Sequence, residues 1–416
     1  DLAEAHYNLG SILIDLGNLK EAEFSTRRAI ELKSDYAKAH SNLGITLKDL
    51  GKLKEAELST RKAIEIKPDF AEAHTNLGII LKDLGKLKEA ELSYRKAIEI
   101  KPDYAQAHSN LGNVLIDLGK LQDAQLSYQK AIEIKPDFAQ AHSNLGNVLK
   151  DLGNFVDAIN HFKQALILNN QLSLVKAALI ETKGSICDWS DQDIQTIWLK
   201  NLGIEGPSVT PAGLLPYEDN PKSNFKRAIN FYKENYTRPT KRINSSKKNK
   251  INIGYFSADF RSHPIMNVMA GVFEFHNKKK FNIFAYSFTN REDKYTERLK
   301  KSVYCFRDIT EKDHIESVNL AREDDLDIAI DLMGYTKNNR MEIFSYRVAP
   351  IQIHYLCNTT GSTEIDYFIA DKIVVPEEFK KYYSEKILYM PNCFMCYDNK
   401  RKISQKKFIR KNFDLP

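Results

Sequence analysis

Apolar residues in the first 172 residues recur three and four positions apart, and this helical pattern itself repeats every 34 residues. Each 34-residue unit holds two such stretches, with a glycine between them and alanines where two helices would approach closely. A single helix pair cannot bury its own apolar face, so consecutive units must stack on one another. The pattern therefore predicts an all-helical superhelix over residues 3–172. Its five units begin at Ala3, Ala37, Ala71, Ala105 and Ala139.

The spacing of these units closely resembles the tetratricopeptide repeat. An asparagine occupies the sixth position of every unit, although asparagine is a poor residue for the interior of a helix. Its amide both donates and accepts hydrogen bonds, which suits it to hold the backbone of an extended peptide. The alternative is that the units are recent duplicates, in which every residue recurs. The five residues of this Asn ladder are Asn8, Asn42, Asn76, Asn110 and Asn144.

After residue 250 the pattern changes to short apolar runs separated by amphipathic segments. This alternation of strand and helix predicts a parallel sheet with helical crossovers, and we expect an α/β Rossmann-like lobe over residues 251–416. The sequence has neither a GxGxxG motif nor a P-loop motif, which argues against dinucleotide-binding and P-loop proteins. The expected strands are 251–257, 281–287, 326–332, 351–356, 366–370 and 387–390, and the expected helices are 264–276, 292–301 and 313–322.

Between these two regions, residues 173–236 have an irregular helical pattern and residues 237–250 form a basic linker. The linker holds six Lys and Arg residues and no acid, which equals the whole net charge of +6. Because the segment is otherwise mostly polar, we expect it to be solvated rather than to bind nucleic acid or anionic lipid. No nucleic-acid or membrane partner is therefore expected. No run of about 18 apolar residues is present, which excludes a membrane-spanning helix.

The five cysteines are few and odd in number, which favours a reducing compartment, here the cytoplasm, over a disulfide framework. Cys393 and Cys396 form a single CxxC pair. A structural zinc site needs four ligands, and no second pair exists, so we expect no bound metal.

Two loops follow predicted strands at the edge where α/β sheets bind ligands. The first contains Asp259 and His263, and Pro264 fits the first position of a helix. A helix N-terminus there favours an anionic group, and a histidine can act as a base or a hydrogen-bond donor near neutral pH. The second loop contains Gly334, which permits a tight turn, and Lys337, which can pair with a phosphate or an acidic acceptor. On chemistry alone, an ordinary loop histidine and an ordinary polar loop stay open as alternatives.

Five short motifs follow one another along the chain: CDWS (Cys187–Ser190), IGYFSADFRSHP (Ile253–Pro264), DLMGYTKNNR (Asp331–Arg340), APIQI (Ala349–Ile353) and YMPNCF (Tyr389–Phe394). Together with the repeats, they resemble the O-GlcNAc transferase family, which includes bacterial members and the SPINDLY proteins. The motifs stand in the family's order, and the resemblance covers essentially the whole chain. It favours a bacterial member.

The resemblance implies an inverting, metal-independent glycosyltransferase of the GT-B type, with two Rossmann-like lobes and no cofactor. Such an enzyme transfers a sugar, GlcNAc first of all, from a nucleotide-sugar donor such as UDP-GlcNAc to Ser or Thr hydroxyls of protein acceptors. By the same resemblance, His263 corresponds to the family's catalytic or sugar-contacting histidine, and the Asn ladder to the residues that hold the acceptor. The other positions matched to the donor and sugar cleft are Asp259, Pro264, Gly334, Tyr335, Thr336, Lys337 and Leu356.

Three features depart from the family pattern. Asp327 stands where animal members carry a second histidine, and residues 356–361 replace the family's Gly-Tyr-Pro-Gly loop. The chain also stops at Pro416, where the family's second lobe begins, and that lobe holds most nucleotide contacts. We therefore expect a C-terminally incomplete enzyme that is inactive alone. The alternative is a tetratricopeptide scaffold with a non-catalytic Rossmann-like domain, and GDP-fucose is the alternative donor.

Overall fold

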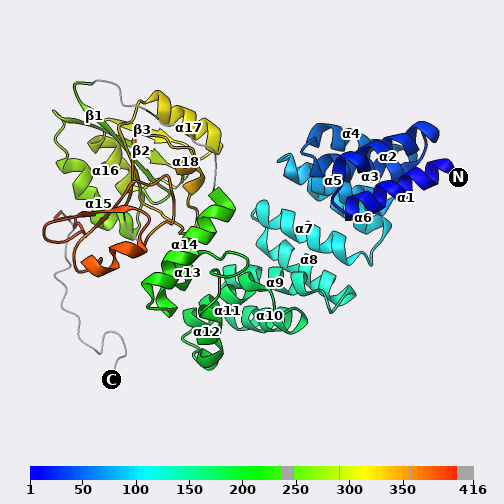
Figure 1. The fold of residues 1–416 in the computed structure, drawn as a ribbon, viewed down its shortest axis with the longest axis horizontal. Helices are drawn as coiled ribbons and strands as arrows, with labels where there is room; N and C mark the ends of the chain where they lie inside the picture. Colours follow the sequence, from blue (N-terminus) through cyan, green and yellow to red (C-terminus); the bar gives the residue numbers. More distant parts are fainter. Residues whose placement is uncertain (237–242, 244–247, 290, 356–357, 401–416) are drawn as a thin grey trace. The chain divides into compact units, whose positions relative to one another are not determined.

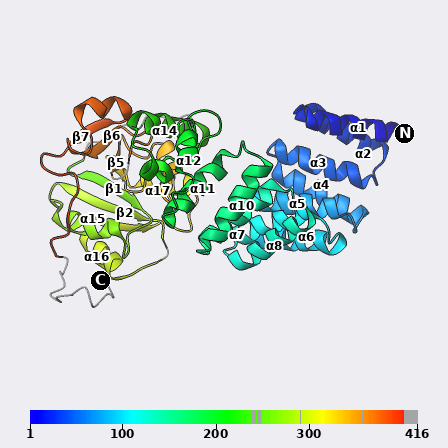
Figure 2. The ribbon, with the colours of Figure 1, turned by 90° about the horizontal axis from the view of Figure 1, so that it is seen from below.

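The computed structural model of the protein describes residues 1–236, 243, 248–289, 291–355 and 358–400. They form two compact units, divided between Ser190 and Asp191, which we describe in turn (Figures 1 and 2). The division falls inside the region that the sequence marks as irregular and helical. Most of the predicted basic linker lies outside the described residues. Among the described residues, no helix is long and apolar enough to cross a lipid bilayer.

Over residues 1–190, the first unit is a stack of five antiparallel helix pairs followed by further helix, which confirms the predicted repeats (Figure 2). In each pair, a first helix (helix A) is followed by a second (helix B). The A helices are α1 (Leu2–Asp15), α3 (Ala37–Asp49), α5 (Ala71–Asp83), α7 (Ala105–Asp117) and α9 (Ala139–Asp151). The B helices are α2 (Leu19–Leu32), α4 (Leu53–Ile66), α6 (Leu87–Ile100), α8 (Leu121–Ile134) and α10 (Phe155–Leu168), and α11 (Ser173–Ser185) follows them.

Helices A and B of every pair approach closely at a glycine of helix A. A Cβ atom on Gly78 would lie 2.7 Å from the ring of Tyr94, so no larger residue fits there without displacing the ring. The side chain that faces this glycine changes along the stack, from threonine in the first two pairs to an aromatic ring in the last three. The facing residues are Thr26, Thr60, Tyr94, Tyr128 and Phe162.

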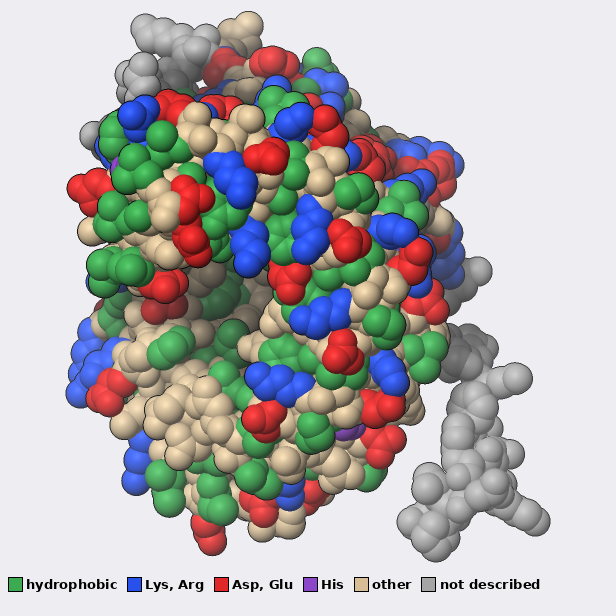
Figure 3. Space-filling model, turned by 90° about the vertical axis from the view of Figure 1, so that its right-hand side faces the viewer, with side chains coloured by type: hydrophobic (Ala, Val, Ile, Leu, Met, Phe, Trp, Pro, Cys, Tyr) green, Lys and Arg blue, Asp and Glu red, His purple; other side chains and the backbone are tan. Residues whose placement is uncertain are grey.

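Recurring ion pairs connect the B helices to the next repeat. Glu57 lies 2.9 Å from Arg61 of its own helix and 2.8 Å from Lys86 of the following repeat. Glu23 and Glu91 have the equivalent two partners one repeat earlier and one repeat later. Hydrogen bonding to Lys86 outweighs burial and lowers the pKa of Glu57. Figure 3 shows one face of the molecule, on which basic and acidic side chains are interspersed over much of the surface.

The second unit opens with helices that are held together by one buried arginine. Arg227 is fully buried, and its guanidinium donates to the backbone carbonyls of Leu199 at 3.0 Å and Leu202 at 2.8 Å. It also lies 2.9 Å from the Glu218 carboxylate, so its charge is compensated. These elements are α12 (Gln192–Leu199), α13 (Pro211–Leu214), the 3₁₀ turn η1 (Leu215–Tyr217) and α14 (Pro221–Tyr236).

A parallel sheet follows, in the strand order β3-β2-β1-β4-β5-β6-β7 within the described residues, which confirms the predicted α/β lobe. β3 (Cys305–Asp308) and α18 (Met341–Ser345) are too short to show a period and were not predicted. The other strands are β1 (Ile251–Ser257), β2 (Phe281–Ser287), β4 (Ile328–Asp331), β5 (Ile351–Tyr355), β6 (Tyr367–Ala370) and β7 (Lys386–Tyr389). The other helices are α15 (Pro264–Phe275), α16 (Lys294–Ser302), α17 (His314–Glu323) and the 3₁₀ helix η2 (Glu377–Tyr382).

Helices cover both faces of this sheet, with α15 and α16 on one face and α17 and α18 on the other (Figure 1). Neighbouring residues of β1 show this division. Tyr255 packs in one core with Phe273 of α15, and Phe256 packs in the other with Phe344 of α18. The strand order reverses between β1 and β4, because β1 leads to β2 and β3 whereas β4 leads to β5. Such a switch point leaves a crevice beyond the carboxyl ends of the strands, where α/β sheets bind ligands.

Candidate functional site

The two loops that the sequence singled out leave adjacent strands at this switch point. They are the β1 loop, residues 258–263, and the β4 loop, residues 332–340. β1 and β4 pair with Phe256 opposite Asp331, so the loops start side by side. The hydroxyl of Ser257, the last residue of β1, lies 3.3 Å from the sulfur atom of Met333 in the β4 loop. The structure therefore brings both predicted segments to the same edge of the sheet.

His263 caps the N-terminus of α15. Its Nδ1 accepts a hydrogen bond from the backbone N–H of Ile265 at 3.3 Å, and Pro264 occupies the first helical position, as predicted. Nδ1 also lies 3.5 Å from Oδ2 of Asp259, and the side chain of His263 is 34% exposed. Because Nδ1 accepts from Ile265, a neutral ring carries its proton on Nε2. In this geometry Nε2 is a hydrogen-bond donor rather than a base.

Two carboxylates hold the β1 loop. Asp259 lies 3.3 Å from Arg261 within the loop. Asp293, which caps α16, also accepts from the backbone N–H of Ser262 at 2.5 Å. Burial opposes ionisation of Asp293, but backbone N–H groups outweigh it and lower its pKa. The sequence analysis did not name Asp293, although Thr296 three residues later completes a capping box, a pattern that can be read from sequence.

A buried Asp–His pair lies beneath the β4 loop. Asp331, the last residue of β4, accepts from the backbone N–H groups of Met333 at 3.0 Å and Gly334 at 2.8 Å. His354 stands opposite it on β5, with Nδ1 2.9 Å from Oδ2 and side chains that are 0% and 4% exposed. The two atoms are close but poorly aligned, and neither ring nitrogen has a well-formed hydrogen bond within the described residues. The sequence analysis did not single out His354, whose signal was one histidine inside an apolar strand.

The other residues predicted for the donor and sugar cleft differ in burial and in hydrogen bonding. Gly334 has a φ of +55°, which favours glycine. Tyr335 is buried and its hydroxyl donates to a backbone carbonyl of the loop after β5, so its side chain belongs to the core. Thr336 donates its hydroxyl to a carbonyl of its own loop at 2.9 Å, and Lys337 is exposed. Leu356 lies outside the described residues.

The Asn ladder connects the A helices of consecutive repeats. Nδ2 of Asn42 donates to the hydroxyl of Ser11 at 2.8 Å, and Nδ2 of Asn76 donates to the hydroxyl of Ser41 at 2.9 Å. Each pair joins one A helix to the A helix before it. No described residue donates to Oδ1 of Asn42 or Asn76 in a hydrogen bond, so both oxygens can accept one from a peptide N–H.

The remaining ladder residues are not equivalent to these two. Oδ1 of Asn110 accepts from Gln106 at 2.9 Å, and Oδ1 of Asn144 accepts from Gln140 at 2.8 Å. Asn8 is exposed on α1. A peptide that bonds to Asn110 or Asn144 must therefore compete with a glutamine, whereas one that bonds to the second and third repeats need not.

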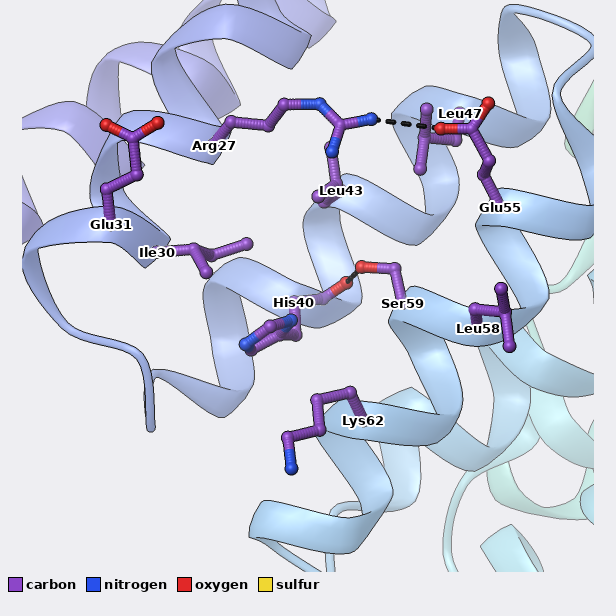
Figure 4. Close-up of a pocket in the computed structure, with 10 residues that line it drawn as sticks. All are labelled: Arg27, Ile30, Glu31, His40, Leu43, Leu47, Glu55, Leu58, Ser59 and Lys62. Atoms are coloured by element: carbon purple, nitrogen blue, oxygen red, sulfur yellow. Dashed lines mark hydrogen bonds and ion pairs between the residues drawn. The ribbon is translucent and has the colours of Figure 1, made fainter.

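A groove between consecutive repeats is a further surface that the sequence analysis did not single out. Figure 4 shows it between α2, α3 and α4, where it is lined by Ile30, Leu43 and Leu58. Its volume is about 450 Å³, and Arg27 reaches across it to Glu55 at 3.1 Å. A groove of the same construction, of about 460 Å³, lies two repeats further along. Two of its three walls are B helices, so it is distinct from the Asn ladder on the A helices.

Taken together, the carboxyl edge of the sheet at the switch point offers a helix N-terminus, a histidine donor and a nearby carboxylate. A helix N-terminus with a donor beside it suits an anionic group such as a nucleotide phosphate. Within the described part of the chain, no three His, Cys, Asp or Glu side chains lie together as metal ligands. The arrangement can bind and orient a phosphate-containing ligand through the protein's own donors.

Residues 224–412 match glycosyl transferase family 41. Several tetratricopeptide repeat families match the preceding part of the chain, between residues 3 and 171. The two kinds of match cover residues 3–171 and 224–412, in the order that the sequence motifs indicate.

Curated relatives of the chain are named as peptide N-acetylglucosaminyltransferases. The chain is 30% identical over 248 residues to the probable UDP-N-acetylglucosamine–peptide N-acetylglucosaminyltransferase SEC of Arabidopsis thaliana. This alignment covers 54% of this chain and 25% of the relative. It is 32% identical over 153 residues to the corresponding protein SPINDLY of the same plant, over 35% and 17% of the two chains. A solved O-GlcNAc transferase mutant from Thermobaculum terrenum aligns with 22% identity and a TM-score of 0.41, over 86% of this chain and 58% of that one. The matches span a quarter or less of these two curated relatives.

Proposed function

We propose that this chain, which joins tetratricopeptide repeats to a family 41 region and so belongs to the O-GlcNAc transferase family, is part of a protein O-glycosyltransferase. The proposed reaction transfers a sugar from a nucleotide sugar to Ser or Thr hydroxyls of proteins that the repeats hold. The single observation that carries the proposal is the meeting of the β1 and β4 loops at the switch point of the sheet.

The β1 loop supplies the group closest to the proposed chemistry. His263 has a donor at Nε2 while its Nδ1 accepts from Ile265, so in this geometry it binds a phosphate or sugar oxygen. A role as general base requires the other tautomer, with Nδ1–H directed to Asp259 at 3.5 Å. The hydrogen-bonding geometry therefore favours a sugar- or phosphate-binding role over proton abstraction.

The donor and the acceptor are assigned by separate observations. UDP-GlcNAc is the proposed donor because the curated relatives are named as UDP-GlcNAc–peptide transferases, and it is a substrate rather than a cofactor. Extended Ser- or Thr-containing protein segments are the proposed acceptors, held first by the oxygens of Asn42 and Asn76. The low cysteine content supports a cytoplasmic location.

The test uses the protein expressed from its complete coding sequence, with labelled UDP-GlcNAc or GDP-fucose and a protein acceptor. We expect GlcNAc on Ser or Thr, and a loss of about 10- to 100-fold in kcat/KM for His263→Ala if the histidine binds the donor. A matched control, His6→Ala, changes a histidine of α1, outside the α/β lobe. Fucose transfer would change the donor and keep the reaction class. Peptide binding without transfer from either donor would favour the scaffold hypothesis.

A further inference from the structure

A cavity of about 290 Å³ lies at the opposite edge of the sheet from the two loops. Lys250 directly precedes β1, Phe281 begins β2, and Tyr304 directly precedes β3, so the cavity lies at the amino ends of these strands. Its volume is close to the lower limit of small-molecule sites. Because the nucleotide crevice of an α/β sheet lies at the carboxyl ends, this cavity is separate from the proposed donor site.

Several of the side chains that line the cavity are apolar or aromatic. Phe273 and Ile283 are 0% and 3% exposed, and Phe281 lies beside them. The ring of His276 meets that of Phe281 edge-on, with ring centroids 6.0 Å apart. Tyr304, at 70% exposed, adds a further ring to the lining. These rings suit a flat apolar group, because aromatic pairs favour edge-on and offset contacts.

The histidine in this lining is held by one hydrogen bond, and burial favours its neutral form. Nε2 of His276 lies 2.9 Å from the hydroxyl of Tyr255, and burial lowers the pKa of His276. When Tyr255 donates to Nε2, the neutral ring carries its proton on Nδ1. No described residue is hydrogen-bonded to that nitrogen, so it is free to donate to a ligand.

The charge of the lining is positive. Lys250 and Lys278 are the only charged side chains among the lining residues, and neither has an ion pair within the described part of the chain. Lys279 and Lys280 follow in the same turn and add to the positive field. Glu274, the nearest acid along α15, is engaged by Arg298 at 2.9 Å and cannot neutralise the lysines.

We infer that this cavity is a binding site for a small anion that carries an aromatic ring, such as an aryl phosphate or aryl carboxylate. The ring packs among Phe273, Phe281 and Tyr304, and the anionic group meets Lys250 and Lys278. This inference goes beyond the proposed function and does not depend on it, because it concerns the other edge of the sheet.

The test is calorimetric titration of the chain with phenyl phosphate. Inorganic phosphate and phenol serve as the two half-probes. We expect one saturable site with a dissociation constant in the millimolar range, about tenfold tighter than either half-probe, because only the whole ligand uses both the rings and the lysines. Lys250→Glu/Lys278→Glu should weaken binding by at least about tenfold. Tyr304→Ala, at an exposed position that leaves the fold intact, should weaken it by about threefold.

The matched control is Lys381→Glu/Lys386→Glu, the same change of charge at two exposed lysines of η2 and β7, with β7 four strands away from β1. Equal weakening by Lys381→Glu/Lys386→Glu would show a general charge effect and overturn the assignment. Unchanged binding in Lys250→Glu/Lys278→Glu would do the same. If inorganic phosphate binds as tightly as phenyl phosphate, the aromatic side chains do not contribute to binding, and the assignment of an aromatic ligand is wrong. Loss of binding in His263→Ala would move the ligand to the β1 loop and also overturn the site.

Discussion

Replacing His354 by methionine should weaken the sheet and loosen the β4 loop. His354 and Asp331 are buried on adjacent strands, 2.9 Å apart, so the variant leaves Asp331 buried without its neighbour. Leaving a buried polar group without a neighbour commonly costs about 1–3 kcal/mol. Asp331 keeps two backbone N–H donors, and methionine refills much of the volume, so we expect about 1–2 kcal/mol here.

The assay is native-state hydrogen exchange of β4, β5 and the β4 loop, because a chain of two units does not unfold in one step. A double-mutant cycle adds Asp331→Asn, which removes the charge while nearly keeping the shape. If the two side chains interact, the double variant should lose at least about 1 kcal/mol less than the sum of the single losses. His6→Met, on α1 of the first unit, controls for the loss of a histidine. Single losses that add within about 0.5 kcal/mol would refute the pairing.

Two further predictions concern the repeats. Glu57→Gln should lower the stability of the repeats by about 0.5–1 kcal/mol at pH 7, because two ion pairs are lost. Since the pKa of Glu57 is lowered from 4.5, this contribution is present above pH 4.5 and disappears as the pH falls through the lowered value; an equal melting difference at pH 7 and pH 3 would contradict it. Asn42→Ala/Asn76→Ala should weaken binding of an extended Ser/Thr peptide by about 5- to 100-fold in fluorescence anisotropy, with unchanged helicity. The matched pair Asn110→Ala/Asn144→Ala should weaken it less, and equal losses would argue against the difference between the two halves of the ladder.

The parts of the fold that were predictable from sequence are those set by local pattern. The helix pairs recur every 34 residues, and β1 and β2 are mostly apolar runs of seven residues. β3 was missed because it has four residues, none of them buried, and lies at the edge of the sheet. The β1 loop was predicted because it follows a clear apolar strand and ends at Pro264, which marks the first position of the next helix.

The missed parts of the site depend on contacts between distant segments. The pairing of Asp331 with His354 is set by the register of β4 and β5, which no local period determines. The inward direction of Tyr335 depends on α14, whose Phe231 meets its ring edge-on at 4.9 Å. The difference within the Asn ladder arises from glutamines four residues earlier, Gln106 and Gln140, which replace other residues in the second and third repeats. The sequence predicted five equivalent asparagines because an asparagine stands at the same position of every repeat.

The change from threonine to aromatic rings opposite the helix A glycines has a consequence for how the stack comes apart. An aromatic ring buries roughly 150–250 Å², and Thr26 and Thr60 are far smaller than Tyr94, Tyr128 and Phe162. Since a linear array is held only by terms within a repeat and between neighbours, local stability should rise along the chain from the second repeat to the third. The first two repeats should therefore unfold locally while the last three stay folded. Asn42 lies in the second repeat and Asn76 in the third, on either side of that boundary. A peptide bound to both oxygens would therefore couple the less stable repeats to the more stable ones.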